Sequence, residues 1–456
     1  MGRGRILALP YPAQGYVSPL MALCRVLEKL GFKVTFVNTD FNHKRIMRAG
    51  VGRDSLSMGS NNINFVSIPD GLDPEDERNE HEFPKLCQSM LLTMPAKLEE
   101  LVRGINNNAA THDDDKITCF LTDFGMSWAL EVANKMGIKG AAYHALCATF
   151  CNATSFIAPN MQLDAFLNSD GINGRGTDQS PEEVENILSL PTGDSDTPKI
   201  MFEYMARNLK AMKKTEWWLC NSAYELEPDE FAKVPRLLPI GPIQTEISGS
   251  SRAQFFQEDS SCLEWLDQQP PCSVIYVAFG SIVTFEPTQF RELALGLDLT
   301  NRPFLWAVRP NIINSSSCAF PDEFKGTRGK IITWAPQPRV LNHPSIACFL
   351  SHCGWTSTIE GLSNAVPFLC WPFVADQITN KKCICDVWKV GVGIFDPDDN
   401  HGIIPRSEIK KKVDLLLGDD NIRARSSQLR DTVLSTTAEG GRSSKNLNNF
   451  LNWLRE

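Results

Sequence analysis

Short apolar runs of β-forming residues alternate with stretches of helical periodicity along the first half of the chain. Apolar residues recur at helical spacing in Ser18–Leu30 and Phe83–Arg103, which predicts amphipathic helices there. The β-rich runs in this half are Arg5–Pro10, Lys33–Thr39, Ile63–Pro69, Ile117–Asp123 and Lys139–His144. Strands that alternate with helices in this way predict a parallel sheet wrapped by helices.

The second half of the chain repeats this alternation. Its β-rich runs are Ser273–Ser281, Phe304–Arg309, Lys330–Thr333, Ile346–Ser351, Pro367–Trp371 and Val390–Ile394. The halves meet near Leu238–Pro242, and the polar stretch Thr245–Ala253 has the composition of a linker. We therefore expect an α/β fold with an N-terminal domain over residues 1–242, a linker over residues 243–257 and a C-terminal domain over residues 258–439.

The last helical stretch, Ser443–Leu454, has one apolar face, because its leucine and phenylalanine residues recur at helical spacing. We expect residues 440–456 to join the N-terminal domain. Two doubly wound domains that face each other form a cleft, and ligands of such folds bind at the carboxyl ends of the strands. The functional residues should therefore lie at those strand ends.

Length, composition and charge exclude several classes of protein. A chain of 456 residues with 42% hydrophobic and 22% charged residues suits two globular domains. The net charge of −9 argues against nucleic acid as a partner. No window approaches the roughly 18 apolar residues of a membrane span, and the first residues lack a secretory signal. The 14 cysteines then indicate reduced thiols, so we expect a cytoplasmic monomer without a membrane span.

The stretch from Trp334 to Gln377 contains the residues that a nucleotide-sugar site needs. The run Ile346–Ser351 ends in His352, and the helix after it opens with hydroxyl side chains at positions 356 to 358. Gly354 permits a close approach of the backbone. The free N–H groups and positive dipole end of such a helix bind phosphate, and His352 adds a donor.

Further residues of the same stretch suit a base and two sugars. Trp334 offers a flat face for a base, and Glu360 can accept hydrogen bonds from ribose hydroxyls. Asp376 and Gln377 can accept hydrogen bonds from the hydroxyls of the sugar that a nucleotide-sugar carries on its diphosphate. For the tryptophans Trp334 and Trp355, the alternative is packing in the core.

This 44-residue stretch resembles the signature of the plant secondary-product glycosyltransferases of family 1, which use UDP-sugars. Pro10–Gly15 and Phe279–Ser281 extend the resemblance over nearly the whole chain. It implies the GT-B fold, in which two Rossmann-like doubly wound domains with mostly parallel sheets face each other. It also implies an inverting, metal-independent transfer of glucose from UDP-glucose to a small lipophilic acceptor, such as a phenolic, flavonoid, terpenoid or carboxylate.

The resemblance also implies a donor site, position by position. A Trp and a Gln at the places of Trp355 and Gln377 favour glucose over galactose in this family. The implied contacts are Trp334 and the Ala335 backbone with uracil, Gln337 and Glu360 with ribose, His352, Ser357 and Ser281 with the diphosphate, and Trp355, Asp376 and Gln377 with the sugar.

No metal or cofactor is expected beside UDP-glucose, which is a co-substrate. Acidic strings that some other glycosyltransferases use to hold a divalent cation occur at Asp113–Asp115, Asp194–Asp196 and Asp396–Asp398. All three lie in polar, loop-like contexts outside the signature, so we interpret them as solvated loops. The helix N-terminus and His352 can stabilise the departing diphosphate without a metal.

The catalytic position departs from the family pattern. The family has a His after Pro-Ala-Gln-Gly that takes the acceptor's proton, and an Asp that orients it. The Asp is present as Asp123, but position 16 is Tyr16. A positioned general base is worth roughly 10²–10⁴ in rate, whereas an ordinary tyrosine is only about 0.1% ionised at neutral pH.

Three explanations of Tyr16 remain open. His144, at the end of the run after Asp123, can serve as the base instead. Alternatively, the acceptor is itself acidic or ionised, such as a carboxylate, phenol or thiol, and Tyr16 lines its pocket. In the third, the enzyme is slow, altered or inactive. Asp123 can act as a weak base in each case.

A second departure is Thr356, where the family has Asn. Thr keeps a hydroxyl donor but is shorter, so we expect weaker or re-aimed contacts with the diphosphate. Together, Tyr16 and Thr356 favour an alternative function, a catalytically impaired protein that binds UDP-sugar or a metabolite. A dinucleotide-dependent oxidoreductase is disfavoured, because no G-x-G-x-x-G follows the first strand.

Overall fold

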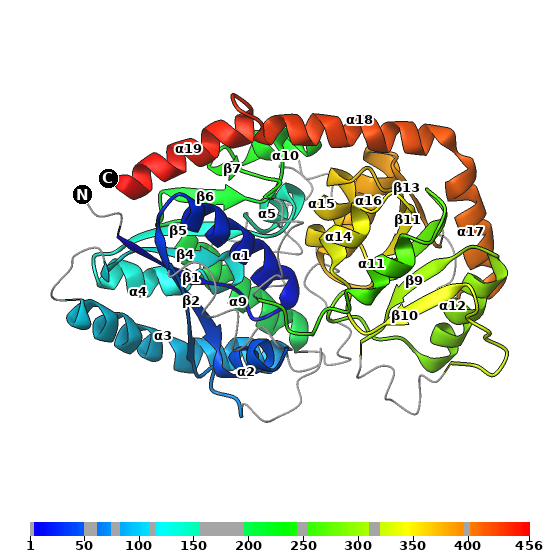
Figure 1. Cartoon of the computed structure of the whole chain (residues 1–456). Coiled ribbons are helices and arrows are strands. Elements are labelled where there is room, and N and C mark those ends of the chain that lie inside the picture. Colours follow the sequence, from blue (N-terminus) through cyan, green and yellow to red (C-terminus); the bar gives the residue numbers. More distant parts are fainter. Residues whose placement is uncertain are drawn as a thin grey trace.

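Two α/β domains lie side by side in the computed structural model of the protein (Figure 1). The structure describes residues 4–49, 62–73, 83–109, 115–155, 196–243, 253–309, 320–395 and 402–456. Each domain contains one sheet, and every strand pair within each sheet is parallel. The predicted pair of doubly wound parallel sheets is therefore confirmed.

The first sheet has seven strands in the order β3-β2-β1-β4-β5-β6-β7. Its strands are β1 (Arg5–Leu9), β2 (Lys33–Thr39), β3 (Ile63–Ile68), β4 (Ile117–Asp123), β5 (Lys139–His144), β6 (Trp217–Cys220) and β7 (Leu237–Pro239). Its helices are α1 (Gln14–Lys29), α2 (Asp40–Arg48), α3 (Phe83–Asn108), α4 (Ala129–Lys135), α5 (Ala148–Ser155), α9 (Thr197–Met212) and α10 (Pro228–Lys233). The strand order reverses between β1 and β4, which is where such sheets bind ligands.

The second sheet has six strands in the order β10-β9-β8-β11-β12-β13. Its strands are β8 (Val274–Ala278), β9 (Phe304–Ala307), β10 (Gly329–Ile332), β11 (Ile346–Ser351), β12 (Phe368–Cys370) and β13 (Gly391–Gly393). Its helices are α11 (Ser261–Leu266), α12 (Pro287–Leu299), α14 (Gln337–Leu341), α15 (Trp355–Ser363), α16 (Asp376–Lys382) and α17 (Arg406–Gly418). Here the order reverses between β8 and β11, so this domain has a second switch point.

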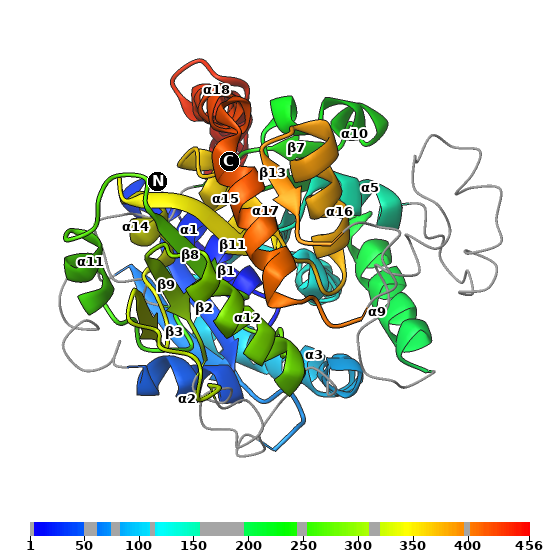
Figure 2. The ribbon, with the colours of Figure 1, turned by 90° about the vertical axis from the view of Figure 1, so that its right-hand side faces the viewer.

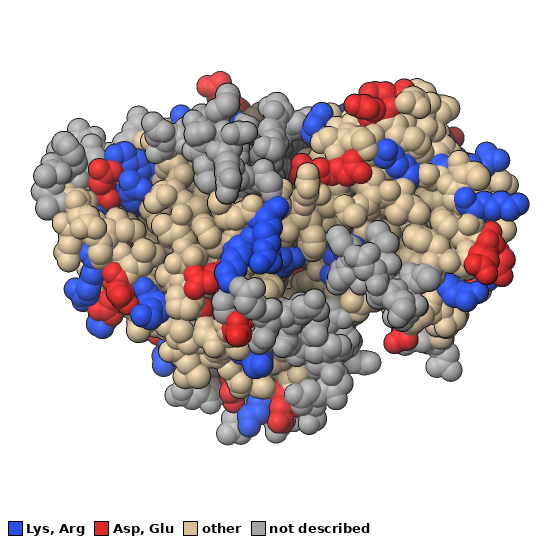
Figure 3. All heavy atoms as spheres, turned by 60° about the horizontal axis from the view of Figure 1, so that its bottom comes forward, with Lys and Arg blue, Asp and Glu red and all other residues tan. Residues whose placement is uncertain are grey.

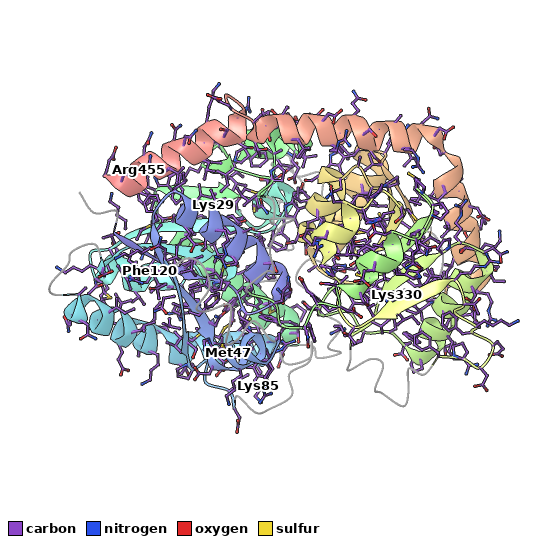
Figure 4. The ribbon with its side chains drawn as sticks, in the orientation of Figure 1. Lys29, Met47, Lys85, Phe120, Lys330 and Arg455 are labelled. Carbon is purple, nitrogen blue, oxygen red and sulfur yellow. The ribbon has the colours of Figure 1, made fainter. Side chains whose placement is uncertain are left out.

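Buried apolar residues explain why the strands form where they do. Every residue of β8 and β11 is buried, as expected of central parallel strands that are covered by helices on both faces. Phe120 of β4 is likewise fully buried, in the middle of the first domain (Figure 4). Among the described residues, no helix has the length and apolar character needed to cross a membrane.

Some boundaries differ from those predicted. Helix α1 begins at Gln14 rather than Ser18, because the amides of Tyr16 and Val17 already donate to the Ala13 carbonyl. Strands β6 and β7 are short, and their apolar runs were not recognised as strands. Of the polar linker, residues 244–252 lie outside the described residues, while Ala253 and Phe255 are buried in the first domain's core.

The chain returns to the first domain at its end. Helices α18 (Asp420–Thr437) and α19 (Arg442–Arg455) run along one side of the molecule from the second domain to the first (Figures 1 and 2). Phe450 of α19 is fully buried, with its ring centroid 5.5 Å from that of Trp217 and 5.8 Å from that of Trp453. Asn446 donates to the carbonyl of Pro239 at 2.8 Å, which fixes α19 beside β7.

Phe450→Ala should lower the free energy of unfolding by about 3 kcal/mol, because it removes a fully buried ring and leaves a cavity. Urea unfolding followed by tryptophan fluorescence measures this change. The matched control is Asn449→Ala on the exposed face of the same helix, which should change it by less than about 0.5 kcal/mol. Equal effects of the two substitutions would contradict the docking of α19.

Candidate active site

A cavity of about 300 Å³ lies between the two domains and is lined by residues of both. Figure 3 shows the face on which the two domains meet, with Lys and Arg side chains gathered near their boundary. The structure brings twelve of the fourteen proposed site residues to this cavity, and only Asp123 and His144 are not part of its lining. The twelve are Tyr16, Ser281, Trp334, Ala335, Gln337, His352, Trp355, Thr356, Ser357, Glu360, Asp376 and Gln377.

Gln337 is the centre of a hydrogen-bond network on the C-terminal side. Its Nε2 donates to Ser357 Oγ at 2.9 Å and to Glu360 Oε2 at 2.8 Å. Its Oε1 accepts from the hydroxyl of Tyr276 at 3.0 Å, so its amide orientation is fixed. Gln337 lies at the start of α14 and Glu360 in α15, and the network therefore holds the two helices in register.

His352 lies between two glycines at the end of β11. A Cβ atom on Gly280 would be 2.7 Å from its Nε2, and one on Gly354 would be 2.6 Å away. Gly280 has φ +68°, which favours glycine in any case. Burial lowers the pKa of His352 to about 4, and the positive charge of Arg309 acts in the same direction. The imidazole is therefore neutral at pH 7 and can present one N–H donor.

Trp334 follows β10 and is half-buried. The ring of Phe256 stacks against it with a centroid distance of 4.8 Å and an interplanar angle of 30°. Its Nε1 donates to Gln254 Oε1 at 3.3 Å. Because Trp334 also lines the cavity, it is placed to offer an aromatic face to a planar ligand.

The first turn of α15 contacts the N-terminal domain directly. The indole Nε1 of Trp355 donates to the carbonyl of Asn221 at 2.9 Å, and the ring is buried. The hydroxyl of Thr356 donates to the carbonyl of Gly15 at 2.9 Å, directly before Tyr16. Thr356 and Tyr16, the two positions at which the chain departs from the family pattern, thus lie close together where the two domains meet.

Asp376 and Gln377 open α16 at the end of a turn from β12. Asp376 Oδ2 accepts from Asn380 at 2.7 Å, and burial raises the pKa of this carboxyl to about 6. Gln377 Oε1 accepts from the amides of Phe373 at 2.9 Å and Val374 at 3.2 Å. Ala375, between Val374 and Asp376, has φ +54°, so the turn holds a non-glycine residue in the left-handed region.

The N-terminal side of the cavity is aromatic. The ring centroid of Tyr16 lies 5.2 Å from that of Tyr11, which also packs 6.5 Å from Phe83 and 6.4 Å from Tyr204. Burial raises the pKa of the Tyr16 hydroxyl well above its usual value, and the charges of Asp376 and Asp123 add to this. Tyr16 is therefore a neutral phenol at physiological pH.

Asp123 ends β4 and is fully buried beneath this wall. Its Oδ1 accepts from the amide of Gly125 at 2.9 Å, while its Oδ2 has no hydrogen-bond partner in the part of the chain that the structure describes. Burial raises the pKa of Asp123 to about 8, although the amides of Gly125 and Phe124 oppose this. At neutral pH the carboxyl is mostly protonated.

The surroundings of His144 do not favour the role of a general base, the first of the three explanations of Tyr16. Its side chain is 1% exposed and stacks on Phe124 at a centroid distance of 4.8 Å. Nε2 lies 3.1 Å from Met212 Sδ, and Nδ1 lies 2.9 Å from Cys151 Sγ. Burial lowers the pKa of His144 to about 3, so the residue is a packed, neutral histidine.

Two charged residues that support the site were not recognised in the sequence. Arg309, at the end of the β9 segment, is buried, lines the cavity and donates to the carbonyl of Ser281 at 2.6 Å. Glu227 is buried and accepts from the amides of Ala148 and Thr149, both at 2.9 Å, which caps α5. The sequence could have indicated Arg309, because a charged residue at the end of a strand is a candidate for the ligand site. No local pattern around Glu227 indicates that it caps α5.

The acidic strings lie mostly outside the described residues. Asp115 is described, and it forms ion pairs with Lys33 at 2.6 Å and Arg5 at 3.2 Å. Asp196 precedes α9, while positions 113, 194, 396 and 398 are not described. Within the described ranges, no three His, Cys, Asp or Glu side chains are grouped so that they could hold a metal ion.

Comparison with known proteins identifies close similarity to one family. The family model "UDP-glucoronosyl and UDP-glucosyl transferase" matches residues 201–395. UDP-glycosyltransferase 83A1 of Arabidopsis thaliana is 40% identical, over 100% of this chain and 97% of that protein. Linamarin synthase 1 of Manihot esculenta is 32% identical, over 98% of this chain and 95% of its own length.

Solved structures show the same architecture. The crystal structure of Os79 from O. sativa in complex with UDP superimposes with a TM-score of 0.81 at 27% identity, covering 98% of this chain and 100% of that one. A structure of the same protein with a trichothecene has a TM-score of 0.78. The similarity of fold therefore spans both domains.

Gly354→Ala should weaken UDP binding about tenfold, because the added Cβ would displace His352 and one hydrogen bond to a charged group is worth roughly that factor. Gly354 has φ −60° and ψ 144°, which alanine adopts freely, so the only penalty is the 2.6 Å contact with the His352 ring. Titration calorimetry measures the affinity. Gly104→Ala in α3, where an added Cβ meets no atom within 4 Å, is the matched control. Unchanged affinity in Gly354→Ala would show that the position of His352 does not matter for UDP.

Asp123→Asn should change how stability depends on pH. Because the folded-state pKa is about 8 and the unfolded value about 4, the native state retains a proton that the unfolded state releases between these limits. Wild-type stability should therefore fall relative to the variant by up to about 1.4 kcal/mol per pH unit from pH 4 to pH 8. Urea unfolding of both proteins at each pH tests this. A difference that is constant with pH would mean that Asp123 is ionised when folded.

Proposed function

The chain belongs to the plant family 1 of UDP-dependent glycosyltransferases, and we propose that it transfers glucose from UDP-glucose to a small lipophilic acceptor. The observation that carries this proposal is the composition of the cavity. Polar side chains of the C-terminal domain lie on one side of it, and aromatic side chains of the N-terminal domain lie on the other. A charged nucleotide-sugar and an apolar acceptor can thus meet within one enclosed space.

The donor is assigned to the C-terminal side. Uracil would stack on Trp334 and pair with the backbone of Ala335, while Gln337 and Glu360 would bind the ribose. Gln337 and Glu360 are held to each other at 2.8 Å, which orients both before the ribose arrives. Asp376 and Gln377, with the first turn of α15 at Trp355, would contact glucose.

The leaving diphosphate would be stabilised without a metal ion. Ser281, Ser357 and the N–H of neutral His352 are the proposed ligands, and the positive end of the α15 dipole faces the same place. The buried guanidinium of Arg309 is near enough to His352 to lower its pKa, so it adds positive charge at this side of the cavity. Activity should therefore persist in a chelator.

The acceptor would attack the anomeric carbon from the N-terminal side. A new bond forms from its oxygen to that carbon while the bond to the β-phosphate oxygen breaks, and UDP leaves from the opposite face. A single displacement of this kind inverts the anomeric configuration. The aromatic wall of Tyr11, Tyr16, Phe83 and Tyr204 suits a flat, apolar acceptor.

The nucleophile would be an acceptor that ionises by itself, such as an acidic phenol or a carboxylic acid. Tyr16 remains a neutral phenol, and Asp123 is mostly protonated at pH 7, so neither removes a proton efficiently. Protonation of Asp123 removes its negative charge from beneath the acceptor wall, which lowers the repulsion of an anionic acceptor there; the charge of Asp376, whose pKa is about 6, remains on the C-terminal side. Tyr16 would then serve as a wall of the pocket.

Wild-type protein should glucosylate an acidic phenol at least about 100-fold faster than an aliphatic alcohol of similar size, because a positioned base is worth roughly 10²–10⁴. Tyr16→His should gain activity toward the alcohol, since an imidazole beside Asp123 can accept the proton of the alcohol. Tyr16→Phe, which keeps the ring and loses the hydroxyl, is the matched control and should retain the phenol activity. Mass spectrometry of the products with UDP-glucose measures all three.

Two outcomes would count against this account. Equal turnover of phenol and alcohol by the wild type would show that a residue of the protein removes the proton of the acceptor. Tight UDP binding without turnover by any of the three proteins would favour a UDP-sugar-binding protein of the same fold instead.

A further inference from the structure

Residues 254–259 surround Trp334, the proposed uracil platform. Phe256 stacks on one face of the indole at 4.8 Å, and Gln254 Oε1 accepts from its Nε1 at 3.3 Å. The amide of Asp259 donates to the carbonyl of Trp334 at 2.9 Å. One face of the indole is thus covered by this segment, while the residue still lines the cavity.

The N-terminal domain holds the same segment through Gln14. Nε2 of Gln14 donates to the carbonyl of Ala253 at 3.1 Å, and its Oε1 accepts from the amide of Phe255 at 2.7 Å. All three residues are buried, and Ala253 and Phe255 belong to the N-terminal core. An amide that pairs twice with the backbone fixes both the position and the direction of the chain that follows.

Arg45 provides a second contact from the N-terminal domain. It lies on α2, the helix marked by Met47 in Figure 4. Its guanidinium carbon is 4.6 Å from the ring centroid of Phe255 and 4.9 Å from that of Phe256. A cation over an aromatic ring is attracted by the ring's negative face, and the planar guanidinium also packs on it.

We infer that Phe256 and Arg45 are positioning residues for the uracil of the donor, although neither is in the C-terminal signature. Phe256 backs the indole of Trp334, so that the base stacks on the opposite face. Arg45 holds Phe256 from the N-terminal domain. UDP affinity thereby depends on a residue of the domain assigned to the acceptor. This inference rests on the proposed role of Trp334.

The first turn of α1 contacts the segment beside Trp334 and also contains Tyr16. Gln14 is the first residue of α1, and Tyr16 lies in the same turn. The chain that backs Trp334 is therefore tied to the turn that holds Tyr16 beside the acceptor.

The test measures UDP affinity by calorimetry in the full chain. Phe256→Ala should raise the Kd about two- to tenfold, the range of one aromatic pair. Arg45→Met, which keeps the apolar stem, should raise it about two- to tenfold, and Arg45→Lys should restore part of the affinity. Arg48→Met, an exposed charge on the same helix, is the matched control and should stay within about twofold.

A kinetic measurement separates positioning from general damage. With UDP-glucose and an acidic phenol, Phe256→Ala and Arg45→Met should raise the KM for UDP-glucose and leave kcat within about twofold. A fall in kcat with unchanged KM would overturn the inference, because it would indicate a disturbed fold rather than a misplaced uracil. A loss in Arg48→Met equal to that in Arg45→Met would overturn the role of Arg45.

Trp334→Ala distinguishes failure of this inference from failure of the proposed function. If Trp334→Ala loses UDP binding but Phe256→Ala and Arg45→Met bind UDP like the wild type, the inference is wrong and the donor site stands. If Trp334→Ala also binds UDP normally, uracil does not stack on Trp334, and the inference falls together with that one assignment in the donor site, while the turnover assay still decides the proposed function.

Discussion

The site depends on how the N-terminal domain holds the donor half of the cavity. Trp355 donates to the carbonyl of Asn221, and Thr356 donates to the carbonyl of Gly15. Gln14 pairs with the segment that backs Trp334. These contacts place the first turn of α15 and the tryptophan platform relative to α1. Neither domain contains a complete site, so a loss of register between them would separate donor from acceptor without unfolding either sheet.

Burial without a strong base defines the chemistry available on the acceptor side. In a low-dielectric pocket the neutral forms of Tyr16 and Asp123 are favoured, because each charge would be poorly solvated. A chain with His at position 16 could offset this by sharing a proton with Asp123. With Tyr16 in that place, the proposed acceptor must be acidic enough to lose its proton to solvent before it attacks, and the aromatic wall would contact the rest of that acceptor. The proposed donor site does not need this base, because its ligands would be the N–H of neutral His352, hydroxyl groups, the α15 dipole and the positive charge of Arg309.

Most of the proposed donor residues could be listed from the sequence because all of them except Ser281 lie within one stretch of 44 residues, and most of those follow a strand or lie near the start of a helix. The parallel sheets followed from apolar runs for the same local reason. The surroundings of His144 could not be predicted, since a strand end indicates the edge of a sheet but not the packing of Met212, Cys151 and Phe124 around the ring. The contacts of Thr356 with Gly15 and of Phe256 with Trp334 join distant parts of the chain, and no local pattern contains them.

Transfer of glucose with inversion and without a metal ion can be tested by proton NMR of UDP-glucose and an acidic phenol in the presence of the protein and a chelator. A β-glucoside is expected as the first product, with one UDP released per glucoside, because a single displacement without a metal ion would invert the α-configured donor. An α-glucoside, a requirement for metal, or UDP-glucose that binds and is never consumed would contradict it.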